Sequence, residues 1–228
     1  MTAKRGRNAV TTRTGPFVRP YRPGDRDAVY DVCVRTADAG GDARGIYRDP
    51  DLMGDLFAGP YVHLAPELAF VLDDGERAVG YAIGTADTAA FAEAFRREWL
   101  PRVAGRYPRA EAPRTPDDHM IELLHTPERM VLPELADHPA HLHIDILPEH
   151  QRAGHGGELM GELLAALRRA GAERVHLGML TANTGARRFY DRLGFHELKV
   201  PDPGPLTYLG RATGELPHRR NRPETGSA

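Results

Sequence analysis

Residues 143–157 combine side chains that could move protons with a backbone that could bind phosphate. They read His-Ile-Asp-Ile-Leu-Pro-Glu-His-Gln-Arg-Ala-Gly-His-Gly-Gly. An apolar strand is expected before the loop and a helix from about Gly154, which places the glycines at a helix N-terminus. Backbone N–H groups there lack intrahelical partners, and the helix dipole favours negative charge. Because Gly154 and Gly156 have no Cβ, a pyrophosphate could approach the loop closely.

The loop does not match the two commonest phosphate-binding patterns. It is not a P-loop, because no Lys-Ser/Thr pair follows the glycines. It is not a dinucleotide fingerprint either, because the spacing Gln151-x-x-Gly154-x-Gly156 differs and no acidic ribose ligand follows the next strand. A second segment lies downstream and reads Asn183-x-x-Ala186-x-x-Phe189-Tyr190-x-x-x-Gly194-Phe195.

Together the two segments resemble the coenzyme A site of the GNAT superfamily of N-acetyltransferases. The resemblance implies direct transfer of an acetyl group from acetyl-CoA to an amine, without a covalent enzyme intermediate. It implies that the strand end pairs with the pantetheine arm and that Tyr190 donates a proton to the departing thiolate. The implied coenzyme-binding residues are Ile146, Leu147, Gln151, Arg152, Ala153, Gly154, His155, Gly156, Gly157, Asn183, Ala186, Phe189 and Tyr190.

A narrower resemblance covers most of residues 17–210. Residues 30–36, 52–55, 70–72 and 80–85 are similar to the C-terminal acetyltransferase-like domain of animal O-GlcNAcase. The phosphate loop of that animal domain is degraded, whereas this chain keeps Gln151, Gly154 and Gly156. We therefore expect a bacterial relative that still binds acetyl-CoA and acts as an enzyme. The alternative is an acyl-CoA-binding sensor or interaction module without turnover. The expected acceptor is a small-molecule amine or a lysine of a protein or peptide, and the residue types carry no code that separates the two.

An amine acceptor must lose a proton before it attacks. A lysine-like amine is neutral only about one part in 2,500 at pH 7, a penalty of roughly 4.6 kcal/mol. Asp145, His143 and His141 alternate along one expected strand face just before the loop. Asp145 is the first choice for the general base and His143 the second. A bulge in this strand would change which side chains face the site. Because no third ligand accompanies the two histidines, no metal site is predicted.

The elements around these motifs predict a mixed α/β fold. Two helices follow a first short strand, and a hairpin spans residues 68–84. A helix at 88–107 and another near 119–124 form a long insertion, after which strand, helix, strand, helix and strand follow from residue 140. We therefore expect the GNAT fold, with a mostly antiparallel sheet, helices on both faces, and a helical insertion between the third and fourth strands.

The predicted boundaries are a single domain at 15–212, with an insertion at about 88–138 and disordered tails at 1–14 and 213–228. Residues 154–167 predict an amphipathic helix whose apolar stripe is Leu159, Leu163, Leu164 and Leu167.

Composition sets limits on the partners. The net charge of −2 predicts neither a nucleic-acid partner nor an anionic membrane. No apolar run approaches the roughly 20 residues of a membrane span. The single cysteine, Cys33, is typical of a reducing compartment, so a cytoplasmic monomer or homodimer is expected. Lysine occurs only at Lys4 and Lys199 whereas arginine is abundant, which is typical of a GC-rich bacterial genome.

Overall fold

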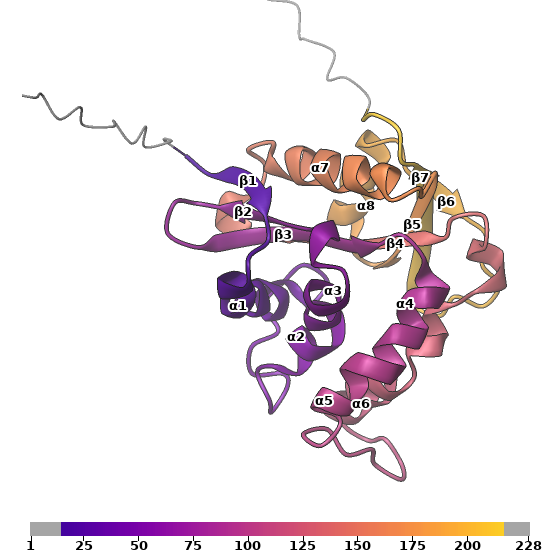
Figure 1. The fold of residues 1–228 in the computed structure, drawn as a ribbon. Helices are drawn as coiled ribbons and strands as arrows, with labels where there is room; N and C mark the ends of the chain where they lie inside the picture. Colours follow the sequence, from indigo (N-terminus) through magenta and orange to yellow (C-terminus); the bar gives the residue numbers. More distant parts are fainter. Residues whose placement is uncertain (1–14, 217–228) are drawn as a thin grey trace, which may run out of the picture.

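A seven-stranded sheet in the order β1-β2-β3-β4-β5-β7-β6 runs through the chain. The computed structural model describes residues 15–216 (Figure 1). All neighbouring strands are antiparallel except β4 and β5, which are parallel. The strands are β1 (Phe17–Pro20), β2 (Ala69–Asp73), β3 (Ala78–Thr85), β4 (Ala140–Ile146), β5 (Arg174–Leu180), β6 (His196–Leu198) and β7 (Leu206–Ala212). The predicted mixed, mostly antiparallel sheet is confirmed.

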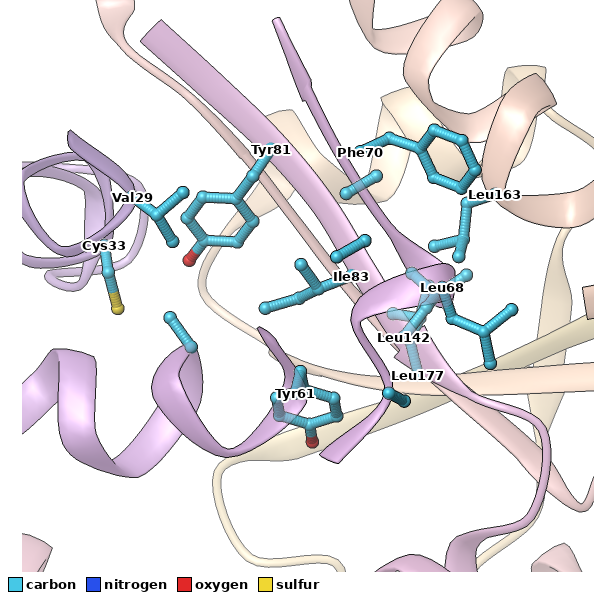
Figure 2. Close-up of a cluster of buried hydrophobic side chains, with 14 of the residues drawn as sticks. Val29, Cys33, Tyr61, Leu68, Phe70, Tyr81, Ile83, Leu142, Leu163 and Leu177 are labelled. Carbon is cyan, nitrogen blue, oxygen red and sulfur yellow. The ribbon is translucent and has the colours of Figure 1, made fainter. Parts of the chain in front are cut away.

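Helices cover both faces of the sheet, as expected. Helices α1 (Arg26–Thr36), α2 (Leu52–Phe57) and α3 (Gly59–Leu64) lie on one side of the sheet in Figure 1, and α7 (His155–Arg169) lies on the other. The predicted stripe of four leucines on α7 is fully buried. Figure 2 shows Leu163 of α7 beside Phe70 on that side, while the Tyr81 hydroxyl is directed toward α1 on the opposite side. The last helix of the described residues is α8 (Thr184–Arg192).

The insertion between β3 and β4 is helical, but it is more broken than the sequence suggested. The expected helix at 88–107 is divided into α4 (Thr88–Ala94), a π-helical turn (Phe95–Trp99) and α5 (Leu100–Val103). Pro101 has no N–H to offer the carbonyl four residues earlier, which accounts for the wider turn just before it. The second helix, α6, is longer than expected (Pro116–His125). Short 3-10 turns at Pro127–Met130 and Pro133–Leu135 lead into β4.

Two further elements were not expected. Helix α3 follows α2 after a single residue, Ala58. Pro60 lies in the first turn of α3, where a missing N–H costs no hydrogen bond. The final strand is two strands, because the chain turns back after β6 and inserts β7 between β5 and β6.

The predicted tails lie almost entirely outside the described residues, and their limits stay predictions. Residues 213–216 are described. The buried Thr213 hydroxyl donates to the Ala172 carbonyl at 2.7 Å.

The buried carboxylate of Asp55 ties the insertion to the first helices. It accepts hydrogen bonds from the Tyr30 hydroxyl of α1 at 2.6 Å and from the Tyr107 hydroxyl at 2.8 Å. The Trp99 indole N–H donates to the Asp55 backbone carbonyl at 2.8 Å. The Arg106 guanidinium lies 3.3 Å from the carboxylate and supplies a countercharge. The insertion is therefore held against α1 and α2 by a buried polar network that is hydrogen-bonded throughout.

Replacing Asp55 tests how much this network contributes. Asp55→Ala leaves two buried tyrosine hydroxyls without an acceptor, and we expect the free energy of unfolding to fall by about 3 kcal/mol. Urea unfolding measures the change. Asp42→Ala is the control, because Asp42 pairs with Arg44 on the surface and its removal should leave stability unchanged. A similar effect of the two substitutions would contradict the prediction.

Candidate functional site

The parallel strands β4 and β5 part soon after they meet. Their pairing is limited to Ala140 with Val175 and His141 with His176. Beyond these pairs the strands border a cleft of about 180 Å³. From its sides the cleft is lined by Thr36, Ala37, Ala39, Gly40, Leu142, His143, Ile144, Asp145, Gly178, Met179, Leu180, Asn183, Ala186 and Tyr190. Five of the sequence-predicted residues are thus brought to one cavity: His143, Asp145, Asn183, Ala186 and Tyr190.

The open edge of β4 carries backbone groups that β5 does not pair. The Leu147 N–H donates to the Val79 carbonyl of the β3 side at 3.0 Å. Because successive N–H groups of a strand point to opposite edges, those of Ile146 and Ile144 point toward the side from which β5 has parted. The edge predicted to pair with an extended ligand is therefore available at Ile146. The Leu147 side chain is buried and its N–H already donates to Val79, so neither the side chain nor the N–H is free to bind a ligand.

The glycine-rich loop presents free amides at the start of α7. Arg152 and Gly154 adopt the left-handed region, with φ of 64° and 101°. Within the described chain, no group accepts from the backbone N–H groups of residues 152–156, which include Ala153 and His155. The amide of Gly157 donates to the Gly154 carbonyl at 2.9 Å, so it is not free. Five consecutive amides at the N-terminus of a 15-residue helix form a site suited to an anion.

Gln151 connects this loop to the open edge. Its side-chain amide donates to the Ile146 carbonyl at 2.8 Å. The carbonyl and the N–H of one strand residue point to the same edge, so Gln151 holds the loop beside the edge. In this structure the Gln151 side chain therefore stabilises the position of the loop.

The two sequence motifs pack directly against each other. A Cβ on Gly156 would lie 2.9 Å from the Phe189 ring of α8, so any other residue would force that ring to shift. Asn183 caps α8, since its side-chain oxygen accepts from the Ala186 N–H at 2.9 Å. Gly156 is therefore required by the contact between α7 and α8 as well as by any approach of a phosphate. The sequence suggested only the second reason.

Tyr190 lies at the inner wall of the cleft. Its ring packs on Phe189 and Phe195, and only 7% of the residue is exposed. Among the described residues its hydroxyl has no hydrogen-bond partner, and no buried side-chain oxygen or nitrogen there lacks one, so the hydroxyl is reached from the cleft. Burial raises the pKa of Tyr190, and the charge of Asp145 raises it further. The hydroxyl therefore stays protonated at neutral pH and can act as a donor.

Asp145 faces the same cleft from β4. Strand β4 pairs with β3 without a register shift, so the bulge considered above does not occur and Asp145 lies opposite Tyr81. The Tyr81 hydroxyl donates to Asp145 Oδ2 at 2.7 Å. Burial raises the pKa of Asp145, while the Tyr81 hydrogen bond opposes that rise. A half-buried carboxylate with one fixed donor and a raised pKa is suited to accept a proton.

His143 and His141 share this strand face, as expected from the alternation. The Tyr61 hydroxyl of α3 lies between them, 2.6 Å from His141 Nε2 and 3.0 Å from His143 Nε2. Burial lowers the pKa of His143 to about 4, and the charge of Arg129 contributes. Burial holds the pKa of His141 well below its usual range. Both rings are therefore neutral at pH 7.

Tyr61 and Tyr81 were missed in the sequence analysis. Tyr61 lies on a helix that was not expected, and the Tyr81–Asp145 pairing depends on a register set across the whole insertion. The alternation of Tyr81 and Ile83 in β3 was the one available signal.

Residues 15–216 hold neither a cluster of metal-ligating side chains nor a helix suited to a membrane. No group of three or more His, Cys, Asp or Glu side chains there is arranged to hold a metal ion. Within the same residues no helix is both long enough and apolar enough to cross a membrane.

The sequence matches one family model and two curated proteins. A family model described as "Acetyltransferase (GNAT) family" matches residues 42–195. Protein O-GlcNAcase of Rattus norvegicus is 29% identical over 202 residues, and that of Mus musculus is 28% identical over 200 residues. Each match covers 86% of this chain and 22% of the relative, so the chain spans about a fifth of the length of the curated relatives it matches.

Solved structures of other proteins are also similar to this chain. The crystal structure of SsHAT is 60% identical, with a TM-score of 0.85, and the match covers 88% of this chain and all of that one. The structure of yncA from Salmonella typhimurium with its cofactor acetyl-CoA is 16% identical, with a TM-score of 0.52, over 88% of this chain and 95% of that one. At that identity the second likeness concerns the fold.

Two neighbouring glycines of α7 provide a matched test of the packing between the motifs. Gly156→Ala should lower the free energy of unfolding by about 1–3 kcal/mol, because the added methyl group meets the Phe189 ring. Gly157→Ala meets nothing within 4 Å and should raise stability by up to about 1 kcal/mol, as alanine does in a helix. Thermal or urea unfolding measures both. Effects of the same sign would show that the Gly156–Phe189 contact does not limit residue size.

Proposed function

Because the family model matches most of its length, the chain belongs to the acetyltransferase (GNAT) family, and we propose that it is an acetyl-CoA-dependent N-acetyltransferase. The observation that carries the proposal is the cleft between β4 and β5, which has Asp145 and Tyr190 on its walls. The free amides of the glycine-rich loop are held beside the open edge of β4 by the hydrogen bond from Gln151 to the Ile146 carbonyl. When bound, acetyl-CoA supplies the activated acetyl group as a thioester.

The chain's own groups fit the three parts of the coenzyme. The amides of residues 152–156 would hold the pyrophosphate at the N-terminus of α7. The edge N–H of Ile146 would bind the amide-bearing pantetheine arm in the way that an added strand pairs. Asn183, Ala186 and Phe189 would support the site from α8, where they cap the helix and hold α7 in place. Gln151 would fix the position of the loop.

Tyr190 would donate a proton to the leaving thiolate. A thiol has a pKa of about 8.5 in solution, so a nearby proton donor makes its departure easier. The Tyr190 hydroxyl is protonated at neutral pH, so it can donate a hydrogen bond to the sulfur as negative charge develops there. Its position on the wall of the cleft, with no competing acceptor among the described residues, leaves the proton free for this step.

Asp145 would accept the proton of the acceptor amine, and the negative charge of its carboxylate would attract the protonated amine first. Burial lowers the pKa of His143 and raises that of Asp145, so burial weakens the histidine as a base and strengthens the carboxylate. We therefore assign the general base to Asp145. His143 remains beside it as a neutral ring that lines the cleft.

The remaining expectations from the sequence stay proposals. We propose a single catalytic domain at 15–212 in a bacterial, cytoplasmic protein that works as a monomer or homodimer. It would need no metal and no nucleic acid. The acceptor is proposed only as an amine, on a small molecule or on a lysine side chain.

Calorimetric titration with acetyl-CoA, followed by coenzyme release over a panel of amines and lysine peptides, tests the function. We expect binding, and release that depends on both acetyl-CoA and an amine. Absence of binding at millimolar acetyl-CoA would contradict the proposal. Binding without release across the panel would favour an acyl-CoA-binding module instead.

Tyr190→Phe tests the role of the hydroxyl within this experiment. It keeps the ring that packs on Phe189 and Phe195 but removes the hydroxyl. Acetyl-CoA affinity should be unchanged, whereas amine-dependent release should slow by about 10²-fold. Tyr21→Phe, which does not alter the cleft, should leave both measurements unchanged.

Asp145→Asn separates catalysis from stability. We expect the rate to fall by about 10²–10⁴-fold, because the amide cannot accept the proton. Since the folded pKa of Asp145 is raised, ionising this carboxyl costs folding free energy above its pKa in the unfolded chain. The variant should therefore be at least as stable as the wild type at pH 7, and this advantage should vanish as the pH falls below about 4.

Urea unfolding at several pH values and steady-state kinetics measure the two effects. Asp202→Asn, at an exposed position, is the control and should change neither. Full activity of Asp145→Asn would place the base elsewhere.

A further inference from the structure

A chain of hydrogen bonds runs from the base of the insertion to the cleft. It begins at the Pro139 carbonyl, which accepts from the Thr88 hydroxyl at 2.7 Å. Thr88 Oγ1 lies 2.8 Å from His141 Nδ1, and His141 Nε2 lies 2.6 Å from the Tyr61 hydroxyl. The Tyr61 hydroxyl lies 3.0 Å from His143 Nε2, and His143 lines the cleft.

The carbonyl at the far end fixes the direction of every bond in the chain. The Pro139 oxygen can only accept, so the single hydroxyl proton of Thr88 points toward it. Thr88 Oγ1 must then accept from His141 Nδ1–H. A neutral histidine carries one N–H, so His141 Nε2 is an acceptor and the Tyr61 hydroxyl donates to it. The Tyr61 oxygen is left to accept from His143 Nε2–H.

The distances agree with this direction. The contact assigned to an O–H donor, Tyr61 to His141, is 2.6 Å, and the contact assigned to an N–H donor, His143 to Tyr61, is 3.0 Å. Hydroxyl donors make shorter hydrogen bonds than N–H donors do. In the reverse direction, Thr88 Oγ1 and the Pro139 oxygen would face each other at 2.7 Å without a hydrogen between them.

The other ring nitrogen of His143 opens on the cleft. Nδ1 has no hydrogen-bond partner among residues 15–216. No buried side-chain nitrogen or oxygen in that part of the chain lacks a partner, so Nδ1 is accessible, and His143 is a wall residue of the cleft.

We propose that these hydrogen bonds hold, or lock, His143 in the tautomer protonated at Nε2, so that Nδ1 presents a fixed lone pair to the acceptor amine. Thr88, His141 and Tyr61 are positioning residues that act through His143. The part played by the amine rests on the proposed function, whereas the locked form of the ring does not.

With its tautomer fixed, His143 offers the amine a second hydrogen-bond acceptor beside Asp145. Asp145 and His143 are two residues apart on β4, so both acceptors face the same ligand. A primary amine has two N–H bonds when neutral and can donate to both, whereas a secondary amine has one. The site therefore favours a primary amine. The series of hydrogen bonds ends at the Pro139 carbonyl, which holds no exchangeable proton. These bonds therefore orient His143 and do not carry protons away from the cleft.

Histidine ring spectra test the lock without any substrate. In ¹⁵N-histidine-labelled full-length protein, long-range ¹H–¹⁵N correlations show which ring nitrogen carries the proton, and His141→Gln and His143→Gln assign the signals. We expect His143 protonated at Nε2 and His141 protonated at Nδ1. A proton on His143 Nδ1 or on His141 Nε2 in the wild type would overturn the proposal.

Substitutions at Thr88 test the origin of the lock. Thr88→Ser keeps the hydroxyl and should keep both ring forms. Thr88→Val removes the acceptor, and the His143 signals should move toward an average of the two forms. An unchanged His143 pattern in folded Thr88→Val would overturn the role of the chain. Should that variant fail to fold, the wild-type and Thr88→Ser spectra decide the question.

Kinetics supply the functional readout. Tyr61→Phe should lower kcat for a primary amine by about five- to tenfold, the size expected for one neutral hydrogen bond, with the KM for acetyl-CoA unchanged. An unchanged kcat would show that the lock does not serve the acceptor. If the ring forms are as expected but no amine is acetylated, the proposed function fails and the lock stands. If amines are acetylated but the ring forms differ from those expected, the lock fails and the proposed function stands.

Discussion

The site depends on the parting of two parallel strands. Strands β4 and β5 share only two residue pairs before they separate. Had they stayed paired, the N–H groups of Ile144 and Ile146 would be used within the sheet, and Asp145 and Tyr190 would have no cavity between them. A sheet normally satisfies its backbone groups internally. Here the N–H groups of Ile144 and Ile146 have no partner strand, although β4 and β5 lie in the middle of the sheet. Gln151 holds the glycine-rich loop beside that same edge.

Burial gives neighbouring groups on β4 different roles. It makes a carboxylate easier to protonate and a histidine harder to protonate. Asp145 is thereby shifted toward accepting a proton, while His143 and His141 are held neutral. Neutral rings have a definite donor and a definite acceptor, which allows a hydrogen-bond chain to have a direction. The low polarity of this region is thus a condition for the ordered arrangement of its polar groups.

Much of the fold was predictable because its signals are local. The leucine stripe of α7, the hairpin of β2 and β3, and the loop at Gly154 each depend on nearby residues. The face shared by Asp145 and His143 followed from the alternation of β4 alone. Tyr61 and Tyr81 were not predictable, because they reach the site through an unexpected helix and through a register set across the insertion. The second reason for Gly156, its contact with Phe189, depends on how two helices pack.

The closure of the insertion at its base has a consequence for how such a protein can diversify. Both the N–H and the hydroxyl of Thr88 bind the Pro139 carbonyl, so the two ends of the insertion are joined beside the sheet. Segments inserted above such a junction can lengthen at little cost, since doubling a loop costs only about 0.6 kcal/mol of closure entropy. The loop at 108–115, which follows the part of the insertion bound to Asp55, can therefore lengthen during evolution while β4 keeps its alignment.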